Sequence, residues 1–348
     1  MASATNTQHT RHTQKLQNPH AQNRQDLTKI LADDFLPLIQ SRCDEWIASL
    51  KSPNIDKIYS TIKSGKMLRS KLIFAILGQR LSNPKSTKSS NILESAIDLC
   101  AVIELVQCAS LLHDDVIDEA KTRRGVPSVN ATFGNKNAIM LGDVLYSKAY
   151  FHLADFPLSI AKSVSNAVCA LSRGEIDDVL YSSEFQPSLE VYYKILEDKT
   201  ASLIASSAES SAILAGLDSL KYYEYGKNLG LAFQIVDDLL DITQDEATLG
   251  KPSMNDLREG KSTLPYILLY DEIDLTKDFA KKEEFLSHFY KRDSVAIKWF
   301  RKSFDTYKII EKTQKIAQDF ITKALNAIKD EQNPTLEQIA TSMINRRF

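Results

Sequence analysis

The chain has 348 residues, with 43 Lys and Arg against 45 Asp and Glu and a net charge of −2 at pH 7. This balance argues against nucleic acid as the main partner, because there is no basic excess. The length allows one large domain or two ordinary ones. Gly accounts for 11 residues, about 3% against the usual ~7%, which favours a mostly helical protein.

The first 25 residues contain no acidic side chain and are rich in Thr, Gln, Asn and His. This composition predicts a disordered tail over 1–25, with an organellar presequence as the alternative. No apolar run reaches the roughly 18 residues that a membrane-spanning helix needs. The four cysteines lack metal-ligand spacing, so we expect reduced core thiols in a cytoplasmic protein.

From Asp26 onward, helical periodicity scarcely stops, which predicts one helical domain over 26–348. We expect helices at 26–50, 67–81, 91–119, 137–155, 158–181, 188–216 and 219–243, with a short element at 54–63. A polar, Gly-containing loop should follow at 244–262, and further helices at 263–347. The helices at 91–119 and 219–243 are apolar nearly all round, which marks them as central.

Each central helix ends in an aspartate cluster of the form DDxxD. The clusters are Asp114, Asp115 and Asp118, and Asp237, Asp238 and Asp241. Positions i and i+4 share a helix face, so each cluster offers a carboxylate pair. Carboxylates are unfavourable at a helix C-terminus, which already carries partial negative charge. One cluster alone could be a solvated surface, but two of the same form predict Mg²⁺ ions with a diphosphate between them.

Cations follow or precede these clusters along the chain. Arg123 and Arg124 lie just past the first cluster, and guanidinium groups bind phosphate oxygens in bidentate fashion. Lys66 and Arg69 follow Gly65 at a predicted helix start, where anions bind readily, although an ordinary surface pair would look the same.

Further along, Lys199 and Thr200 combine a cation and a hydroxyl midway along a helical segment. Lys251 and Lys261 lie in the loop after the second cluster. We expect such a loop to close over phosphates and exclude water.

Five segments in fixed order carry a resemblance to a known family. They are GKMLR at 65–69, LLHDDVIDEAKTRRG at 111–125, KT at 199–200, FQIVDDLLD at 233–241 and GKPSMNDLREGKSTLP at 250–265. In these the chain resembles the trans-isoprenyl diphosphate synthases (polyprenyl synthetases) over roughly 26–348. The resemblance implies an all-α, single-domain isoprenoid synthase helix bundle with a central substrate cavity, the two DDxxD motifs facing each other across its mouth. It also implies a homodimer.

The resemblance implies a role for each motif residue. Mg²⁺ would bind Asp114, Asp118 and Asp237, with Asp115, Asp238 and Asp241 in support. The allylic diphosphate would bind Arg123, Lys199 and Lys251, with Thr200 and Gln234 beside the reacting carbons. Isopentenyl diphosphate would bind Lys66, Arg69 and Arg124, and Lys261 would join the closing loop.

Four positions depart from the family pattern. Gln107 stands where the family usually has His, so we expect weaker binding of isopentenyl diphosphate, because an amide donates to phosphate but carries no charge. Met67, Ser70 and Ser64 stand where the family usually has Arg, Pro and Gly. None of these changes removes a metal ligand.

The implied reaction is head-to-tail prenyl transfer. Mg²⁺ and cations neutralise the departing diphosphate, the allylic C–O bond ionises, and the double bond of isopentenyl diphosphate attacks. The released diphosphate then takes the proton. This chemistry needs no protein nucleophile, which agrees with the lack of a Ser/His/Asp or Cys/His signature. His113 has no partner that the sequence reveals, so we expect a structural role for it.

Small side chains one turn before Asp114 predict a long product, because bulky aromatics there stop the growing tail in the family. The chain-length residues expected to line the tail's path are Ala109, Ser110, Val106, Val164 and Val168. The product expected is an octaprenyl-type chain, between heptaprenyl and decaprenyl, for quinone side chains, and its release could involve peripheral membrane contact. A farnesyl or geranylgeranyl diphosphate synthase is the alternative.

Two other functions share the fold. Non-catalytic partner subunits of the family usually lose one aspartate cluster, and both are intact here. Terpene cyclases generally carry an NSE-type second motif, whereas this chain has an Asp-rich one. A metal-dependent phosphohydrolase fits the motifs least.

Overall fold

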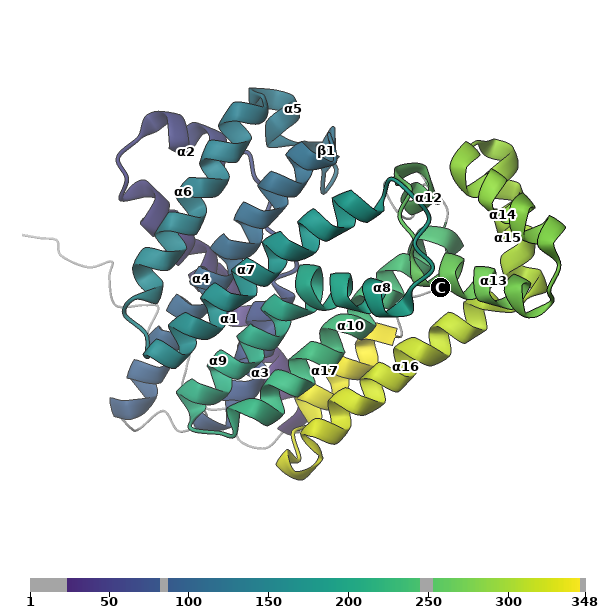
Figure 1. Ribbon diagram of the computed structural model, residues 1–348. Helices are drawn as coiled ribbons and strands as arrows, with labels where there is room; N and C mark the ends of the chain where they lie inside the picture. The colour runs from purple at the N-terminus through teal and green to yellow at the C-terminus, as the bar shows by residue number, and fades with distance from the viewer. Residues whose placement is uncertain (1–23, 82–86, 245–252, 345–348) are drawn as a thin grey trace, which may run out of the picture.

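The computed structural model describes residues 24–81, 87–244 and 253–344, and nearly every element in this part of the chain is a helix (Figure 1). The helices are α1 (Arg24–Ala48), α2 (Pro53–Tyr59), α3 (Leu68–Leu81), α4 (Thr87–Ile117), α5 (Val129–Phe133), α6 (Asn135–Leu153), α7 (Leu158–Tyr181), α8 (Leu189–Leu196), η1 (Glu197–Ala201), α9 (Ser202–Ala215), α10 (Ser219–Thr243), α12 (Asn255–Glu259), α13 (Leu264–Leu275), α14 (Phe279–Lys291), α15 (Ser294–Thr306), α16 (Ile309–Ala327), η2 (Lys329–Glu331) and α17 (Pro334–Ile344). The predicted all-α class is confirmed. Residues 1–23 of the predicted tail and residues 245–252 of the predicted loop, including Lys251, lie outside the described residues.

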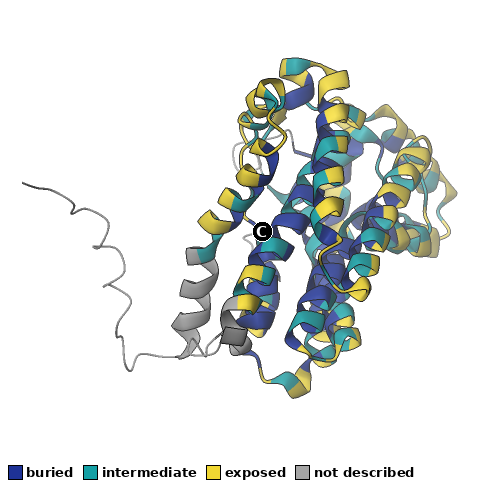
Figure 2. Cartoon of the chain, turned by 90° about the vertical axis from the view of Figure 1, so that its left-hand side faces the viewer, coloured by how far each residue is buried: buried dark blue, intermediate teal, exposed yellow. Residues whose placement is uncertain are grey.

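The two helices that end in aspartate clusters occupy the middle of the bundle. Helix α4 packs against α1, α3 and α6, and its apolar side chains join the largest core cluster. Helix α10 packs against α9 and α16 and contributes to three further clusters. Figure 2 shows buried residues where the helices meet and exposed residues on the outer faces. Both clusters are therefore carried by core helices, as their all-round apolar sequences predict.

Part of α4 is long and apolar enough to cross a membrane by length and composition alone. This segment, Asn91–Ile117, has a mean hydropathy of 1.7 over its most apolar window, and 61% of that window is buried inside the protein. Glu94, Asp98 and Glu104 interrupt this segment, so it is not an uninterrupted apolar run. Packing against neighbouring helices explains the composition of α4 as that of a core helix.

The connection after α4 contains a small β-hairpin that the sequence analysis did not predict. Strand β1 (Thr122–Arg123) pairs antiparallel with β2 (Val126–Pro127). Between them, Arg124 and Gly125 have φ values of 54° and 74°. Two successive residues with positive φ are typical of tight hairpin turns. Strands of two residues are too short for an alternating pattern to reveal them.

The cysteines of the described chain are free, as predicted, but they do not all lie in the core. Cys43 and Cys100 are buried, whereas Cys169 is exposed on α7. The prediction of a core thiol was wrong for Cys169, because Cys169 lies on the outer face of α7 although its neighbours Val168 and Leu171 are buried. His113 does take a structural place: its Nε2 lies 3.1 Å from the carbonyl oxygen of Ile139 on α6.

Candidate active site

The first aspartate cluster lies where α4 ends and the hairpin begins. Asp115 is buried, and its Oδ1 accepts a hydrogen bond from Arg123 Nε at 2.8 Å. Asn130 Nδ2 donates to the carbonyl oxygens of Asp115 and Ala120, at 2.9 and 3.1 Å, which satisfies carbonyl groups at the helix end. Asp115 thus fastens the hairpin to α4, which agrees with a supporting role.

Asp114 is crowded by other acids. Burial, Glu175 on α7 and Asp118 raise its pKa, against the lowering effect of Lys199, to about 7. A carboxylate in this setting is costly when ionised, because its charge is only partly compensated. A cation held between Asp114 and Asp118 would compensate it.

Lys199 lies between this cluster and α7. Its Nζ is 2.7 Å from Glu175 Oε2 and 2.7 Å from Asp178 Oδ2. Burial alone would lower the pKa of Lys199, but Asp178 and Glu175 raise it above its ordinary value, so the ammonium stays charged. The sequence analysis missed both acids, although the segment GEIDD at 174–178 places them three residues apart on one helix face.

Lys261, in the loop after α12, lies close to acids of the same group. Its Nζ is 2.5 Å from Glu259 Oε2, 3.9 Å from Asp118 Oδ1 and 4.0 Å from Asp178 Oδ2. The structure therefore brings three predicted site residues, Asp118, Lys199 and Lys261, to one place from three distant segments.

The three aspartates of the second cluster differ in burial. Asp238 is buried and accepts hydrogen bonds from Tyr192 Oη at 2.6 Å and Gln234 Nε2 at 2.9 Å. Burial nevertheless raises its pKa to about 7. Asp241 is also buried, and its two carboxylate oxygens accept from the backbone amides of Asn255 and Asp256 at 3.2 and 3.1 Å.

Asp237 is the half-buried member of this cluster. It is less buried than Asp238 and Asp241. The role expected for Asp237 as a metal ligand stays a prediction.

The segment that carries Lys199 and Thr200 is a π-helical turn, η1, inside a longer helical run. Such turns often occur at functional sites. Gly174 on α7 faces it closely: a Cβ at Gly174 would lie 2.6 Å from the backbone nitrogen of Lys199. The absence of a side chain at Gly174 therefore lets α7 approach the turn.

We expect Gly174→Ala to push α7 away from η1. Overpacking of this kind destabilises a fold by about 1–3 kcal/mol, and it should displace Lys199 from Glu175 and Asp178. Thermal unfolding and the KM for the allylic substrate measure the two effects. Gly134→Ala is a contrasting variant, because a Cβ there meets no atom within 4 Å and only its φ of 85° is strained. An unchanged melting temperature in Gly174→Ala would contradict the close approach.

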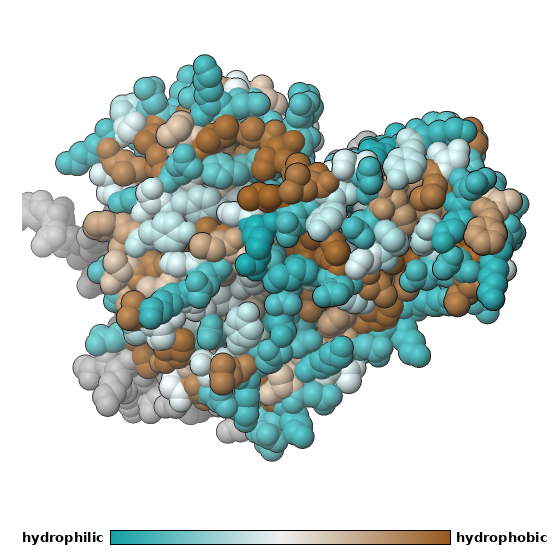
Figure 3. All heavy atoms as spheres, in the orientation of Figure 1, coloured by the Kyte–Doolittle hydropathy of each residue, from teal (hydrophilic) through white to brown (hydrophobic). Residues whose placement is uncertain are grey.

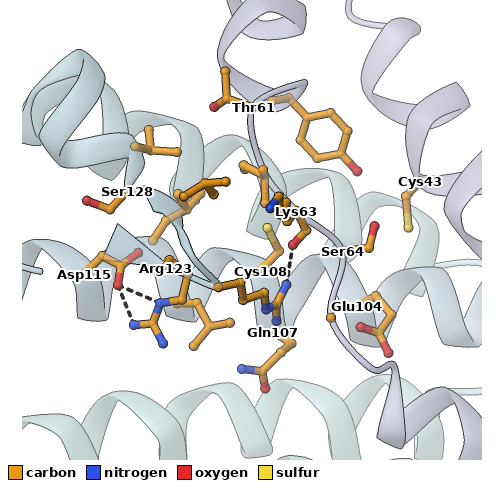
Figure 4. Close-up of a pocket in the computed structure, with 18 of the residues that line it drawn as sticks. Cys43, Thr61, Lys63, Ser64, Glu104, Gln107, Cys108, Asp115, Arg123 and Ser128 are labelled. Carbon is orange, nitrogen blue, oxygen red and sulfur yellow. Dashed lines mark hydrogen bonds and ion pairs between the residues drawn. The ribbon is translucent and has the colours of Figure 1, made fainter. Parts of the chain in front are cut away.

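A pocket beside the hairpin is lined by two of the four residues expected to bind isopentenyl diphosphate, Gln107 and Arg124 (Figure 4). It has an empty volume of about 820 Å³, open solvent included, and is lined by Gly65, Gln107, Arg123 and Arg124 among others. Arg124 Nη1 donates to the carbonyl oxygen of Lys63. Gln107 Oε1 is buried without a hydrogen-bond partner among the described residues.

Lys66 and Arg69 lie beside this pocket rather than among its lining residues. Lys66 is exposed, and burial lowers the pKa of Arg69 to about 10, with Glu104 acting in the opposite direction. Ser70 Oγ donates to Glu104 Oε1 at 2.7 Å, a bond that Pro at this position could not make. Glu104 is a further residue that the sequence analysis missed, since a single acid in an apolar helix gives no pattern.

A second pocket, with an empty volume of about 740 Å³ including open solvent, collects the residues expected at the reacting carbons. Its lining includes Lys199, Thr200, Gln234, Asp238 and Lys261. The predicted site residues thus divide into two neighbouring groups, with Asp115 and Arg123 in the first pocket.

The chain-length residues are all buried. Ala109, Val106, Val164 and Val168 belong to one core cluster, and Ser110 Oγ donates to the carbonyl oxygen of Gln107 at 3.0 Å. In the described part of the chain, neither pocket is lined by Ala109 or Ser110. Their role as the wall of a path for the product stays a prediction.

The donor set fits a hard cation that keeps other ligands. Among the described residues, no three His, Cys, Asp or Glu side chains converge as a ready metal site. One or two carboxylates plus substrate phosphates are the usual protein environment of Mg²⁺. Asp114 near the end of α4, Asp118 just past that end, and Asp237 on α10 are the carboxylates predicted to act in this way.

Comparisons with known proteins agree with the geometry. The family model described as polyprenyl synthetase matches residues 53–305. The chain is similar to the octaprenyl pyrophosphate synthase of Helicobacter pylori, with 47% identity, a TM-score of 0.83, and coverage of 90% of this chain and 99% of that one. It is similar to a prenyl transferase of Cyanidium caldarium, with 37% identity over 272 residues, 74% of this chain and 80% of the relative.

A polyprenyl synthase of Caulobacter crescentus CB15, solved with calcium and isoprenyl diphosphate, shares the fold. The two chains are 26% identical with a TM-score of 0.80, and the match covers 95% of this chain and 100% of the Caulobacter chain.

Proposed function

The chain belongs to the polyprenyl synthetase family, and we propose that it adds isopentenyl diphosphate units head-to-tail to an allylic diphosphate, with Mg²⁺. The product proposed is a long-chain all-trans-polyprenyl diphosphate for quinone side chains. The observation that carries the proposal is the meeting of Asp118, Lys199 and Lys261, three motif residues from separate segments. The similarity to an octaprenyl pyrophosphate synthase supports the long product.

In this mechanism the side chains bind the two diphosphate substrates, orient them and shield the reacting carbons. Lys199, Lys261 and Arg123, with Lys251, bind the allylic diphosphate, and Thr200 and Gln234 place oxygen atoms beside the reacting carbons. Lys66, Arg69, Arg124 and Gln107 bind isopentenyl diphosphate. Asp114, Asp118 and Asp237 would hold Mg²⁺, which would neutralise the charge that develops on the departing diphosphate. That diphosphate accepts the proton lost after the new C–C bond forms.

Incubation with labelled isopentenyl diphosphate and an allylic primer tests the proposal. A ladder of lengthened products separates a synthase from a non-catalytic partner subunit, a cyclase or a phosphohydrolase, because only a synthase adds units. A product that stops at farnesyl or geranylgeranyl supports the alternative of a short-chain synthase. No lengthening with purified protein, primer and Mg²⁺ rejects the activity.

Metal binding should depend on pH near neutrality. A divalent cation competes with the proton for the oxygens of Asp114, whose pKa is about 7. The ionised form binds the cation, so Mg²⁺ affinity should fall about tenfold per pH unit below 7 and level off above it, if one proton is displaced. Calorimetric titrations at pH 6, 7 and 8 measure this. In Asp114→Asn the affinity should be lower and its pH dependence flatter; equal slopes in both proteins would contradict the assignment.

The expected second subunit is a copy of the same chain, and we propose that α6 and α7 form the interface. Apolar side chains are exposed along both helices, including Phe151 at 68% and Leu180 at 66%. Figure 3 shows apolar atoms gathered along this side of the molecule. Exposed apolar patches of this kind mark sites of protein contact.

Leu180→Glu, combined with Ile176→Glu, should convert a dimer into a monomer, because two charges would have to be buried at the interface. Light scattering coupled to gel filtration measures the mass. Leu220→Glu is the control, since Leu220 is 72% exposed on α10 and belongs to neither α6 nor α7. A dimer that survives the double substitution would place the interface elsewhere.

We also propose a cytoplasmic location and a single domain over 26–348 preceded by a tail. The free thiols of the described residues support a reducing compartment.

A further inference from the structure

Four side chains form a hydrogen-bonded network between two helical segments in the second pocket. Tyr192 Oη donates to Asp238 Oδ2 at 2.6 Å, and Gln234 Nε2 donates to Asp238 Oδ1 at 2.9 Å. Thr200 Oγ1 donates to Gln234 Oε1 at 2.9 Å. All four residues line the pocket. The network therefore reaches from a buried tyrosine to the hydroxyl expected beside the reacting carbons.

The backbone places these residues close together. Gln234 and Asp238 are four residues apart on α10 and share a face, while Tyr192 and Thr200 belong to the continuous run of α8 and η1. Gly230 lets the two segments approach, because a Cβ there would lie 2.6 Å from the Cα of Ala201. Because the two segments lie this close, a side chain on one segment can hydrogen-bond directly to a side chain on the other.

The network fixes the direction of each hydrogen bond. The Asp238 carboxylate accepts from two donors, so the amide nitrogen of Gln234 must face it and the amide oxygen must face Thr200. The hydroxyl hydrogen of Thr200 is then committed to Gln234. Its oxygen lone pairs remain for whatever occupies the pocket. Without a firmly held Asp238, the amide could turn over and present a donor to Thr200 instead.

We infer that Tyr192 is a positioning residue for ionisation of the allylic substrate, acting through Asp238 and Gln234 on the orientation of the Thr200 hydroxyl. This inference rests on the proposed function. Oxygen lone pairs fixed in advance toward a developing positive charge stabilise the transition state without reorganisation. The Tyr192 side chain is almost fully buried, and its ring packs in the core beside α10.

Tyr192→Phe removes the donor and keeps the ring. We expect kcat to fall about tenfold, with the KM for the allylic diphosphate within about twofold of wild type, since the lost interaction acts only in the transition state. Binding of an unreactive thio analogue of the allylic diphosphate, measured by calorimetry, should be unchanged. Tyr225→Phe is the matched control: Tyr225 is buried on α10 and its hydroxyl donates to the carbonyl oxygen of Leu336 at 2.8 Å. That variant should lose stability but keep kcat.

A double-mutant cycle tests the path through Thr200. Thr200→Val removes the hydroxyl, and adding Tyr192→Phe to it should cause no further loss of kcat, because residues acting as one unit are non-additive. In Thr200→Ser, which keeps the hydroxyl, Tyr192→Phe should again lower kcat. Independent, multiplicative losses would overturn the inference, as would an unchanged kcat in Tyr192→Phe. A wild-type protein that adds no isopentenyl units would instead reject the proposed function.

Discussion

Asp114→Ala is expected to lower kcat for chain elongation by about two to three orders of magnitude while the helices stay folded. Asp114 lies on the last turns of α4 with Asp118 four residues on, and Glu175 and Lys199 nearby. Its removal breaks the carboxylate pair that would hold a cation against the departing diphosphate. Steady-state assays with labelled isopentenyl diphosphate measure the loss, and circular dichroism checks the fold.

Asp143→Ala is the matched control for this substitution. Asp143 lies on α6, 3.5 Å from His113 Nε2, and its side chain is half exposed. The substitution removes one negative charge near the same helix end and leaves the proposed site residues unchanged, so activity should stay near wild type. EDTA should abolish wild-type turnover and Mg²⁺ should restore it. Near-normal activity in Asp114→Ala would contradict the role given to this residue.

The same acid should weaken the substrate-free fold. Because burial and neighbouring acids raise the pKa of Asp114 to about 7, its ionised form is disfavoured in the folded state. Stability from this group is therefore greatest when it is protonated and is lost as pH rises through 7. Without its cation, the site holds like charges close together, and this lowers the stability of the folded protein. The loss of stability accompanies the function of the site.

The sequence predicts those parts of the site that follow helix periodicity. Both aspartate clusters sit at the ends of apolar helices, so their place beside a buried core follows from the sequence. Glu175 and Asp178 were missed because two acids on one face of α7 resemble any solvated helix surface. Their pairing with Lys199 depends on Gly174, whose close approach to η1 only the packed structure reveals.

The remaining unpredicted features also depend on tertiary packing, which the sequence does not show. Tyr192 reads as an ordinary core aromatic of an amphipathic helix, and its hydroxyl gains a role only from the position of Asp238 on α10. The π turn that carries Lys199 and Thr200 has no sequence pattern of its own, since it inserts one residue into a continuous helix. The expected helix over 188–216 is therefore correct in extent, but not in the geometry of its functional residues.

The small residues before the first cluster lead to a prediction about product length. Ala109 and Ser110 lie about one turn before Asp114 on α4, and both are buried. One turn spans ~5.4 Å, roughly the length of an isoprene unit. If the growing chain passes between α4 and α7, each further turn of small or flexible side chains accommodates about one more unit.

Ala109→Phe should therefore shorten the product from the heptaprenyl-to-decaprenyl range to about farnesyl or geranylgeranyl. The aromatic ring would block the space toward Val106 and Val168, which belong to the same core cluster. Chromatography of the reaction products measures chain length, and the rate at which isopentenyl units are consumed should stay comparable to wild type.

A graded series controls for damage to the core. Ala109→Val should shorten the product less than Ala109→Phe, and Ser110→Ala should leave it unchanged, because it adds no volume. A loss of activity with unchanged product length in Ala109→Phe would indicate general disruption of packing rather than a blocked path. If wild type already stops at farnesyl or geranylgeranyl diphosphate, the small residues at 109 and 110 do not open a path for a long chain, and its floor must lie on another pair of helices.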